Sequence, residues 1–218
     1  MKYVIMCGGN YVKWKSPRQL TRINGEPLVV RTTRLLTECG VDKKDITVTA
    51  SKETASEFMK YCDIVQVYNL NEYAYTEYNK FTGYWCDCFV PMNEPCTYLC
   101  GDVVFSPNAI RTIVEKETND IEFFASAPPF AKNYPKEWAE PFAFKVVNID
   151  HLKQAQIHTK TLYRAGEFER KPIAWEFWQV VKCTPLNVID YTNYTVINDY
   201  TCDIDEPADI KKFEGGNL

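Results

Sequence analysis

The fold of this chain is decided by Val4-Ile5-Met6-Cys7-Gly8-Gly9-Asn10-Tyr11-Val12-Lys13-Trp14-Lys15-Ser16-Pro17-Arg18-Gln19-Leu20. An apolar strand runs into two glycines and then into a cationic loop. Because glycine has no Cβ, the backbone N–H groups of Gly8 and Gly9 can approach phosphate oxygens closely. The basic side chains that follow carry the charge that attracts a triphosphate, and they are Lys13, Lys15 and Arg18. This order of parts predicts a phosphate-binding loop, and the alternative is a plain Gly-Gly turn before a solvated loop.

A turn and a helix follow the basic loop, over residues 23–36. Pro27 suits the first position of a helix. The apolar residues at 28, 29, 35 and 36 share one helical face. The chain therefore reads as strand, glycine loop, turn and helix.

With these parts the chain resembles the nucleotidyltransferases that make activated sugars and alcohols. Their N-terminal signature reads roughly L-A-x-G-x-G-x-R, then P-K, a short strand and G-K-P-L. The corresponding residues are Ile5, Cys7, Gly8, Pro17, Arg18, Gly25, Glu26, Pro27 and Leu28. Asn10 stands where the family has its second glycine, and it tolerates a left-handed backbone. Val12 replaces the family arginine, whose phosphates Lys13 or Lys15 can reach.

The resemblance implies an α/β fold of the MobA-like type, a Rossmann-like three-layer sandwich with a mostly parallel mixed sheet. Strands are expected at 2–7, 46–50, 64–67, 96–100, 121–127 and 142–147, and helices at 27–39, 52–61, 78–86, 107–116, 152–157 and 175–181. We expect a single domain over residues 1–218. Its first half (1–120) would bind the NTP, and its second half (121–218) would bind the acceptor and add a C-terminal metal-binding strand.

A metal ligand is expected where the apolar run Cys96-Thr97-Tyr98-Leu99-Cys100 ends in Gly101-Asp102. The carboxyl ends of strands are where α/β sheets place their ligands. Mg²⁺ takes few protein carboxylates and completes its shell with phosphate oxygens and water. The resemblance implies that Asp102 binds the metal ion. It also implies that the nucleotide is contacted by Gly101 together with Cys7, Gly8, Gly9 and Asn10. A simple turn is the alternative for Gly-Asp, and Ser106 and Pro107 are expected to begin the next helix.

The segment Asp203-Ile204-Asp205-Glu206-Pro207-Ala208-Asp209-Ile210 resembles the D-I-D-x-P-x-D-[IL] ending of many family members. Alternation along an extended backbone puts Asp203 and Asp205 on one side and Ile204 on the other. Two carboxylates that close repel each other unless a cation lies between them. Either aspartate is a candidate metal ligand. Glu206 and Asp209 are also explained by a favourable interaction with a helix N-terminus.

Recognition of the base is expected in the segment 77–85, which resembles the Y-N-N-x-x-S pattern of choline-phosphate cytidylyltransferases. Asn79 offers a donor and an acceptor to a pyrimidine edge, and Thr82 offers a hydroxyl. On this resemblance CTP is the favoured NTP. Capping of a helix is the equal alternative for Asn79.

The second half is rich in aromatic and basic residues, which suggests an acceptor pocket. Candidates for the acceptor phosphate are Lys145, Arg164, Arg170 and Lys171, and surface charges are the alternative. An aromatic box for a cationic alcohol-amine group would use Trp138, Trp175 and Trp178, and core packing is the alternative.

Composition narrows the class of protein. The formal net charge is −4, and the basic residues are dispersed, which argues against nucleic acid as a partner. No window has the ~18 to 20 apolar residues needed to cross a bilayer, and the N-terminus reads as a strand and not a signal peptide. The chain has nine cysteines, and this odd number argues against a disulfide framework. Their spacing does not match that of a zinc site. We interpret the chain as cytoplasmic and compatible with a homodimer.

Together these patterns predict transfer of a nucleoside monophosphate, CMP by preference, from an NTP to a phosphorylated sugar or alcohol, with Mg²⁺ and release of pyrophosphate. Arg18, Lys13, Lys15 and Asp102 would act on the phosphates. A glycosyltransferase of related fold is the first alternative, although Val103 and Val104 follow Asp102 where a D-x-D motif is needed. A catalytically inactive nucleotide-binding module is the second.

Overall fold

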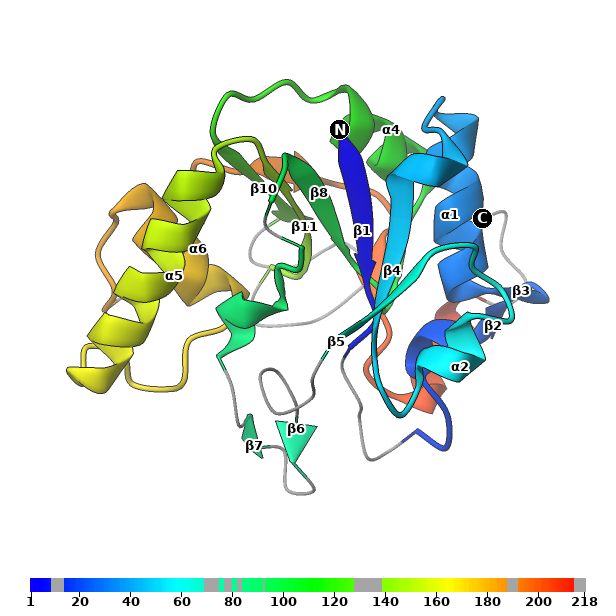
Figure 1. The fold of residues 1–218 in the computed structure, drawn as a ribbon, viewed down its shortest axis with the longest axis horizontal. Helices are drawn as coiled ribbons and strands as arrows, with labels where there is room; N and C mark the ends of the chain where they lie inside the picture. Colours follow the sequence, from blue (N-terminus) through cyan, green and yellow to red (C-terminus); the bar gives the residue numbers. More distant parts are fainter. Residues whose placement is uncertain are drawn as a thin grey trace.

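A seven-stranded sheet forms the centre of the molecule (Figure 1). The computed structural model describes residues 1–8, 14–68, 75–76, 80–81, 84–91, 93–127, 139–187 and 192–213. The strand order is β12-β10-β11-β8-β1-β4-β5. The strands are β1 (Lys2–Met6), β4 (Ile46–Ser51), β5 (Val65–Tyr68), β8 (Cys96–Cys100), β10 (Ile121–Ser126), β11 (Pro141–Val146) and β12 (Thr195–Ile197). Among these seven strands β11 alone runs antiparallel to its neighbours.

Helices cover both faces of the sheet. One core cluster joins it to α1 (Leu28–Glu38), α2 (Ala55–Phe58) and α4 (Pro107–Glu115). The other cluster joins it to α5 (Ile149–Arg164), α6 (Ala174–Lys182) and the 3₁₀ turn η3 (Trp85–Cys88). Ile5 and Val4, neighbours on β1, belong to opposite clusters, as the alternation of a strand requires. The predicted three-layer α/β sandwich with a mostly parallel mixed sheet is confirmed.

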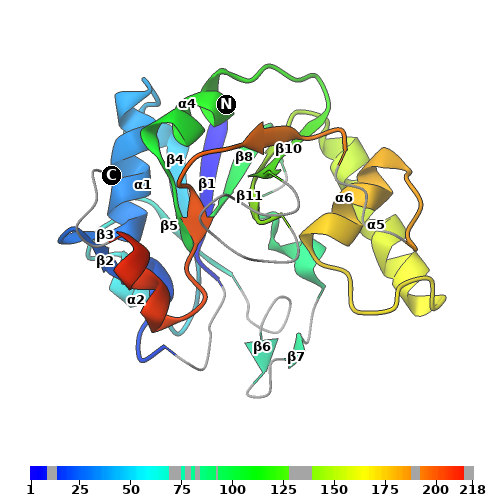
Figure 2. The same ribbon diagram turned by 180° about the vertical axis from the view of Figure 1, so that it is seen from behind.

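Short elements build the edge of the sheet where the strands end. The hairpin of β2 (Arg22–Ile23) and β3 (Glu26–Pro27) turns through Asn24 and Gly25, both with positive φ, as Asn-Gly turns do. The strand β9 (Val103–Val104) pairs antiparallel with β13 (Cys202–Asp203). The C-terminal 3₁₀ segment η4 (Pro207–Phe213), red in Figure 2, packs through Phe213 against Ile23 and Leu28. The C-terminal segment thereby packs against the β2–β3 hairpin and the start of α1.

One predicted helix is wrong. Residues 78–86 were expected to be helical, but β7 (Lys80–Phe81) pairs with β6 (Tyr75–Thr76), and η3 follows. A glycine at 83 disfavours a helix interior by about 1 kcal/mol. The tighter η3 turn also places Trp85 and the following Phe89 against Phe144, with ring centroids 5.8 and 5.2 Å away. The predicted helix 52–61 shortens to α2, whereas α5 extends well beyond 152–157.

The described residues contain no helix that is both long and apolar enough to span a bilayer.

The N-cap of α4 provides a first test of how the local sequence determines where a helix begins. Ser106 Oγ accepts a hydrogen bond from Ala109 N at 2.9 Å, with Pro107 in the first turn, as predicted. We expect Ser106→Ala to lower the free energy of unfolding by about 1 kcal/mol in urea titrations. Asn108→Ala, an exposed position on the same helix, should change it by less than half as much. Equal effects of the two substitutions would refute the cap.

Candidate functional site

A cleft of about 290 Å³ opens where β1 and β8 end. The ends of these parallel strands supply Met6 and Gly8 on one side and Cys100 and Asp102 on the other. The remaining lining residues are Arg18, Gln19, Thr49, Tyr84, Trp85, Cys88, Glu140, Pro141, Ile173, Ala174, Asp203 and Asp205. We call this the Asp102 cleft. It lies where parallel sheets of α/β proteins bind their ligands.

Arg18 lies among the acidic residues of the cleft. Its guanidinium forms an ion pair with Asp102, and its Nη1 lies 3.1 Å from Asp205 Oδ1 and 3.2 Å from Ile204 O. Burial opposes the charged form, but the nearby carboxylates outweigh it and raise the pKa of Arg18. Arg18 therefore stays charged at any physiological pH.

The C-terminal tail brings its aspartates to the end of β8. Ile204 N donates to Asp102 O at 2.9 Å, next to the pairing of β13 with β9. Ile204 is fully buried, whereas Asp203 and Asp205 line the Asp102 cleft. This is the alternation that the sequence predicts. Asp205 is half-exposed and Asp203 is buried.

Asp209 has a structural role. Its Oδ2 accepts hydrogen bonds from the backbone N–H groups of Asp205 and Glu206 at 3.0 and 2.8 Å, and its Oδ1 pairs with Lys212 at 2.7 Å. Burial acts against ionisation, but these contacts lower the pKa of Asp209. The cap holds the tail in the turn that presents Asp205 to Arg18.

The donor chemistry of the cleft fits Mg²⁺. Asp102, Asp203 and Asp205 offer carboxylate oxygens, and Mg²⁺ binds through one or two carboxylates and substrate phosphates. Within the part of the chain that the structure describes, no three His, Cys, Asp or Glu side chains converge closely enough to hold a metal ion. Mg²⁺ held by one or two of these carboxylates would complete its shell with water or with oxygens of a bound molecule.

Close packing of residue 101 against Met6 and Cys7 requires a glycine at this position. A Cβ at this position would lie 2.5 Å from Met6 O and 2.7 Å from Cys7 Sγ. The Gly101 N–H donates to Met6 O at 3.1 Å. Cys7 itself is buried, and burial raises the pKa of its thiol well above the ordinary value. The structure thus gives Cys7 and Gly101 roles in joining β1 to β8, and the nucleotide contacts expected of them stay predictions.

Several predicted residues cannot be placed. Gly9, Asn10, Lys13, Asn79, Thr82 and Trp138 lie outside the described residues. Lys15 is exposed and is not among the residues that line the cleft.

Three cations surround the ring of Tyr84, which lines the Asp102 cleft. Lys160 Nζ, Arg164 Cζ and Lys171 Nζ lie 5.5, 5.9 and 5.3 Å from its centroid. Arg164 Nε donates to Tyr84 Oη at 3.3 Å, and Lys160 forms an ion pair with Asp87. We call Tyr84, Lys160, Arg164 and Lys171 the Tyr84 cluster. Two of the candidate acceptor residues, Arg164 and Lys171, thus meet around Tyr84, although neither is itself among the residues that line the cleft.

The other acceptor candidates are held by structural contacts. Arg170 pairs with Glu176 at 2.6 Å, and Glu176 caps α6 by accepting from Ile173 N at 3.1 Å. Trp175 is buried and donates from Nε1 to Ala139 O at 2.6 Å. The prediction that Trp175 and Trp178 take part in an aromatic box is therefore corrected, because both are core side chains that pack on Phe123.

Lys145 does not reach the cleft. It pairs in register with Thr97 near the start of β8, and its Nζ donates to Val114 O at 3.0 Å and Lys116 O at 2.6 Å. Burial lowers its pKa. Expecting Lys145 at the acceptor phosphate was wrong, since its ammonium caps the last carbonyls of α4 at the opposite end of the sheet.

Sequence reasoning missed Gln19 and Glu140 as cleft residues, and it included Tyr84 and Trp85 only as part of the segment 77–85 that is expected to contact the base. Glu140 is buried, and the Glu140 N–H donates to Ser126 Oγ at 2.8 Å. Its position just before β11, the antiparallel strand, was the available signal, because the start of such a strand lies beside the ends of its parallel neighbours.

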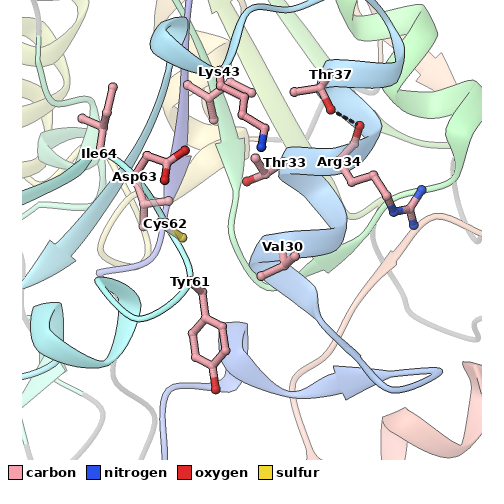
Figure 3. Close-up of a pocket in the computed structure, with 11 residues that line it drawn as sticks. Val30, Thr33, Arg34, Thr37, Lys43, Tyr61, Cys62, Asp63 and Ile64 are labelled. Carbon is pink, nitrogen blue, oxygen red and sulfur yellow. Dashed lines mark hydrogen bonds between the residues drawn. The ribbon is translucent and has the colours of Figure 1, made fainter.

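A second pocket of about 250 Å³ lies between α1 and the segment before β5 (Figure 3). Thr33 of α1 points toward Lys43 and Asp63 across it. It contains no residue that the sequence predicts for a site.

Comparison with known proteins identifies the fold. No protein-family model matches the sequence, and a search of curated proteins gives no match. Solved structures match over nearly the whole chain. A putative glucose-1-phosphate thymidylyltransferase from Bacillus anthracis, in complex with a sucrose, has a TM-score of 0.63 at 14% identity, covering 100% of this chain and 97% of its own.

Two further structures agree. The 4-diphosphocytidyl-2C-methyl-D-erythritol synthase from Anaerococcus prevotii has a TM-score of 0.53 at 13% identity, covering 97% of this chain and 94% of its own. HddC from Yersinia pseudotuberculosis, complexed with GMP-PN, has a TM-score of 0.52 at 14% identity, covering 97% of this chain and 96% of its own. The chain has the nucleotidyltransferase fold. This confirms the fold that the sequence resemblance implies, and at these identities the likeness extends to the fold alone.

The position of Lys145 gives a test within this nucleotidyltransferase fold. We expect Lys145→Met to lower the free energy of unfolding by about 1 to 3 kcal/mol, because the carbonyls of Val114 and Lys116 lose the donor that the buried Lys145 side chain supplies. Thermal or urea unfolding measures this, with Lys153→Met at an exposed position on α5 as the control. An unchanged stability would show that the cap contributes nothing.

Proposed function

We propose that this protein transfers a nucleoside monophosphate from an NTP to a phosphorylated small-molecule acceptor and releases pyrophosphate. The observation that carries the proposal is the meeting of Gly8, Arg18 and Asp102 in one cleft at the ends of β1 and β8. The sequence pattern predicts these residues for a triphosphate. The nucleotidyltransferase fold supports the same interpretation.

In the proposed reaction an oxygen of the acceptor phosphate attacks the α-phosphorus of the NTP. A new phosphorus–oxygen bond forms as the bond to the β-phosphate oxygen breaks, and the electron pair leaves on pyrophosphate. The acceptor phosphate is already an anion, so no strong general base is needed. Alignment of the two phosphates contributes roughly 7 to 11 kcal/mol in favourable cases.

The side chains of the cleft supply alignment and charge. Arg18, which lines the cleft, would donate to phosphate oxygens with its planar fork, and the backbone at Gly8 would approach them closely. Mg²⁺ held by Asp102 with Asp203 or Asp205 would neutralise charge that develops on the phosphates. Lys13 and Lys15 remain proposed partners of the triphosphate.

The Tyr84 cluster is the proposed site of the acceptor phosphate. Arg164 is exposed and makes no ion pair with a described residue, and its hydrogen bond to Tyr84 aims it at the cleft wall. Beside it, Trp85, Pro141 and Ile173 provide apolar surface for the body of the acceptor. An acceptor with one anionic end and a compact sugar or alcohol body matches this wall.

The preferred base is proposed from the sequence resemblance alone. CTP is favoured because the segment around Asn79 and Thr82 resembles choline-phosphate cytidylyltransferases.

The glycosyltransferase alternative is weakened by β9. Val103 and Val104 are fully buried, and their strand pairs with β13. The backbone after Asp102 therefore turns into a small sheet and cannot present a second carboxylate of a D-x-D motif. An inactive nucleotide-binding module is the remaining alternative, because Asn10 and Val12 replace family residues.

A pyrophosphate-release assay tests the function. We expect release with Mg²⁺, one of the four NTPs, CTP by preference, and an acceptor from a panel of sugar 1-phosphates and phosphocholine. Asp102→Asn should lower the rate by on the order of 10² to 10³, because it keeps the shape and removes the charge. Asp63→Asn, an exposed aspartate in the second pocket, should leave the rate unchanged. Binding of NTP without pyrophosphate release with every acceptor would favour the inactive module.

The acceptor end has its own test. We expect Arg164→Ala to raise KM for the acceptor about tenfold while KM for the NTP stays constant, since a charge-assisted hydrogen bond contributes about 1.5 to 3 kcal/mol. Arg111→Ala, which removes the same charge from the surface of α4, is the control. A rise in KM for the NTP instead would move Arg164 to the nucleotide.

A further inference from the structure

Arg18 occupies the position among the cleft carboxylates where a cation would be expected to bind. Its guanidinium contacts Asp102 and Asp205, and Asp203 acts on it electrostatically. The side chains of Arg18 and Asp102 are only 16% and 20% exposed. The sequence predicts a metal ion between these carboxylates, and the structure places an arginine there.

Hydrogen bonds hold the backbones that carry the carboxylates. Trp14 Nε1 donates to Asp205 O at 3.0 Å, and Asp209 caps the N–H of Asp205. The carbonyl of Asp102 accepts from Ile204 N at 2.9 Å. Arg18 reaches the carboxylates from η1 (Arg18–Leu20) by a long side chain with several rotatable bonds. A change of rotamer can therefore carry the guanidinium away from the carboxylates without moving the backbone of either segment.

Three carboxylates act on Arg18, those of Asp102, Asp203 and Asp205. Such a site attracts a divalent cation. A cation arriving alone must displace Arg18, however, and the described part of the chain does not gather three metal-ligating side chains for it. Protein ligands alone offer it little in exchange.

We propose that Arg18 is the resident counter-ion of Asp102 and Asp205, and that a divalent cation replaces it only together with a nucleotide whose phosphate oxygens accept the displaced guanidinium. This inference rests on the proposed nucleotide site. The exchange conserves charge, because the phosphates bring the negative charge that Arg18 needs after it leaves the carboxylates. The phosphates also bring the oxygen ligands that the metal ion lacks.

The exchange makes metal and nucleotide binding interdependent. A nucleotide that draws Arg18 away raises the affinity for the metal ion, and by linkage the metal ion raises the affinity for the nucleotide by the same factor. Substitution of Arg18 should remove much of this coupling. It should also strengthen the binding of a metal ion alone, whereas it should weaken the binding of a nucleotide alone.

Mn²⁺ binding without nucleotide is the decisive measurement, by electron paramagnetic resonance or calorimetry on the full chain. We expect Arg18→Ala to bind Mn²⁺ about tenfold more tightly than the parent, within the usual range of couplings between sites. It should bind CTP more weakly in the absence of metal. Arg18→Lys should stay close to the parent for Mn²⁺, since it keeps the charge.

Arg22→Ala is the matched control, because this substitution removes the same charge at an exposed position a few residues away. It should leave Mn²⁺ binding unchanged. Adding Asp102→Asn to Arg18→Ala should abolish the gain, which locates the ion. Circular dichroism checks the fold, and Arg18→Gln replaces the alanine variant if the latter unfolds.

Two results would overturn the inference: tight Mn²⁺ binding by the parent without nucleotide, or an Arg18→Ala variant that binds Mn²⁺ no more tightly. Neither depends on turnover. If Mn²⁺ binding rises as expected but no NTP binds in any variant, the counter-ion role stands and the proposed function fails.

Discussion

The close approach of β1 and β8 is the constraint on which the site depends. Gly101 N donates to Met6 O, and a side chain at Gly101 would collide with that carbonyl and with Cys7. Because the backbones touch here, Gly8 and Asp102, which follow the two strands, open into the same cleft. A larger residue at this position would separate the phosphate-binding loop from the acidic residue that is expected to work with it.

Polar contacts join the C-terminal tail to the segment after β1 and to β9 at this edge. The tail pairs with β9, its aspartates contact Arg18, and Trp14 holds the backbone of Asp205. Ile204 fixes the direction of both aspartates, because its burial among Ile23 and Val104 leaves them the cleft side. The apolar packing of one residue thus determines where two charges point.

Two parts of the site differ in chemistry. Carboxylates lie around Arg18, whereas cations gather around Tyr84. In the proposed reaction the metal ion that accompanies the triphosphate would bind at the carboxylates. The acceptor phosphate, which comes without a metal ion, would meet the cations around Tyr84.

Local sequence determined the elements whose causes are local. The apolar strands, the Ser106 cap and the alternation of Asp203, Ile204 and Asp205 follow from neighbours in the chain, and they are as predicted. Tertiary structure decided what depends on distant partners. Lys145 faces α4 because of the register of β11 with β8, and Trp175 is core because α6 packs on β10. The pairing of Arg18 with Asp205 links residues 187 positions apart, and sequence spacing carries no information about such an approach.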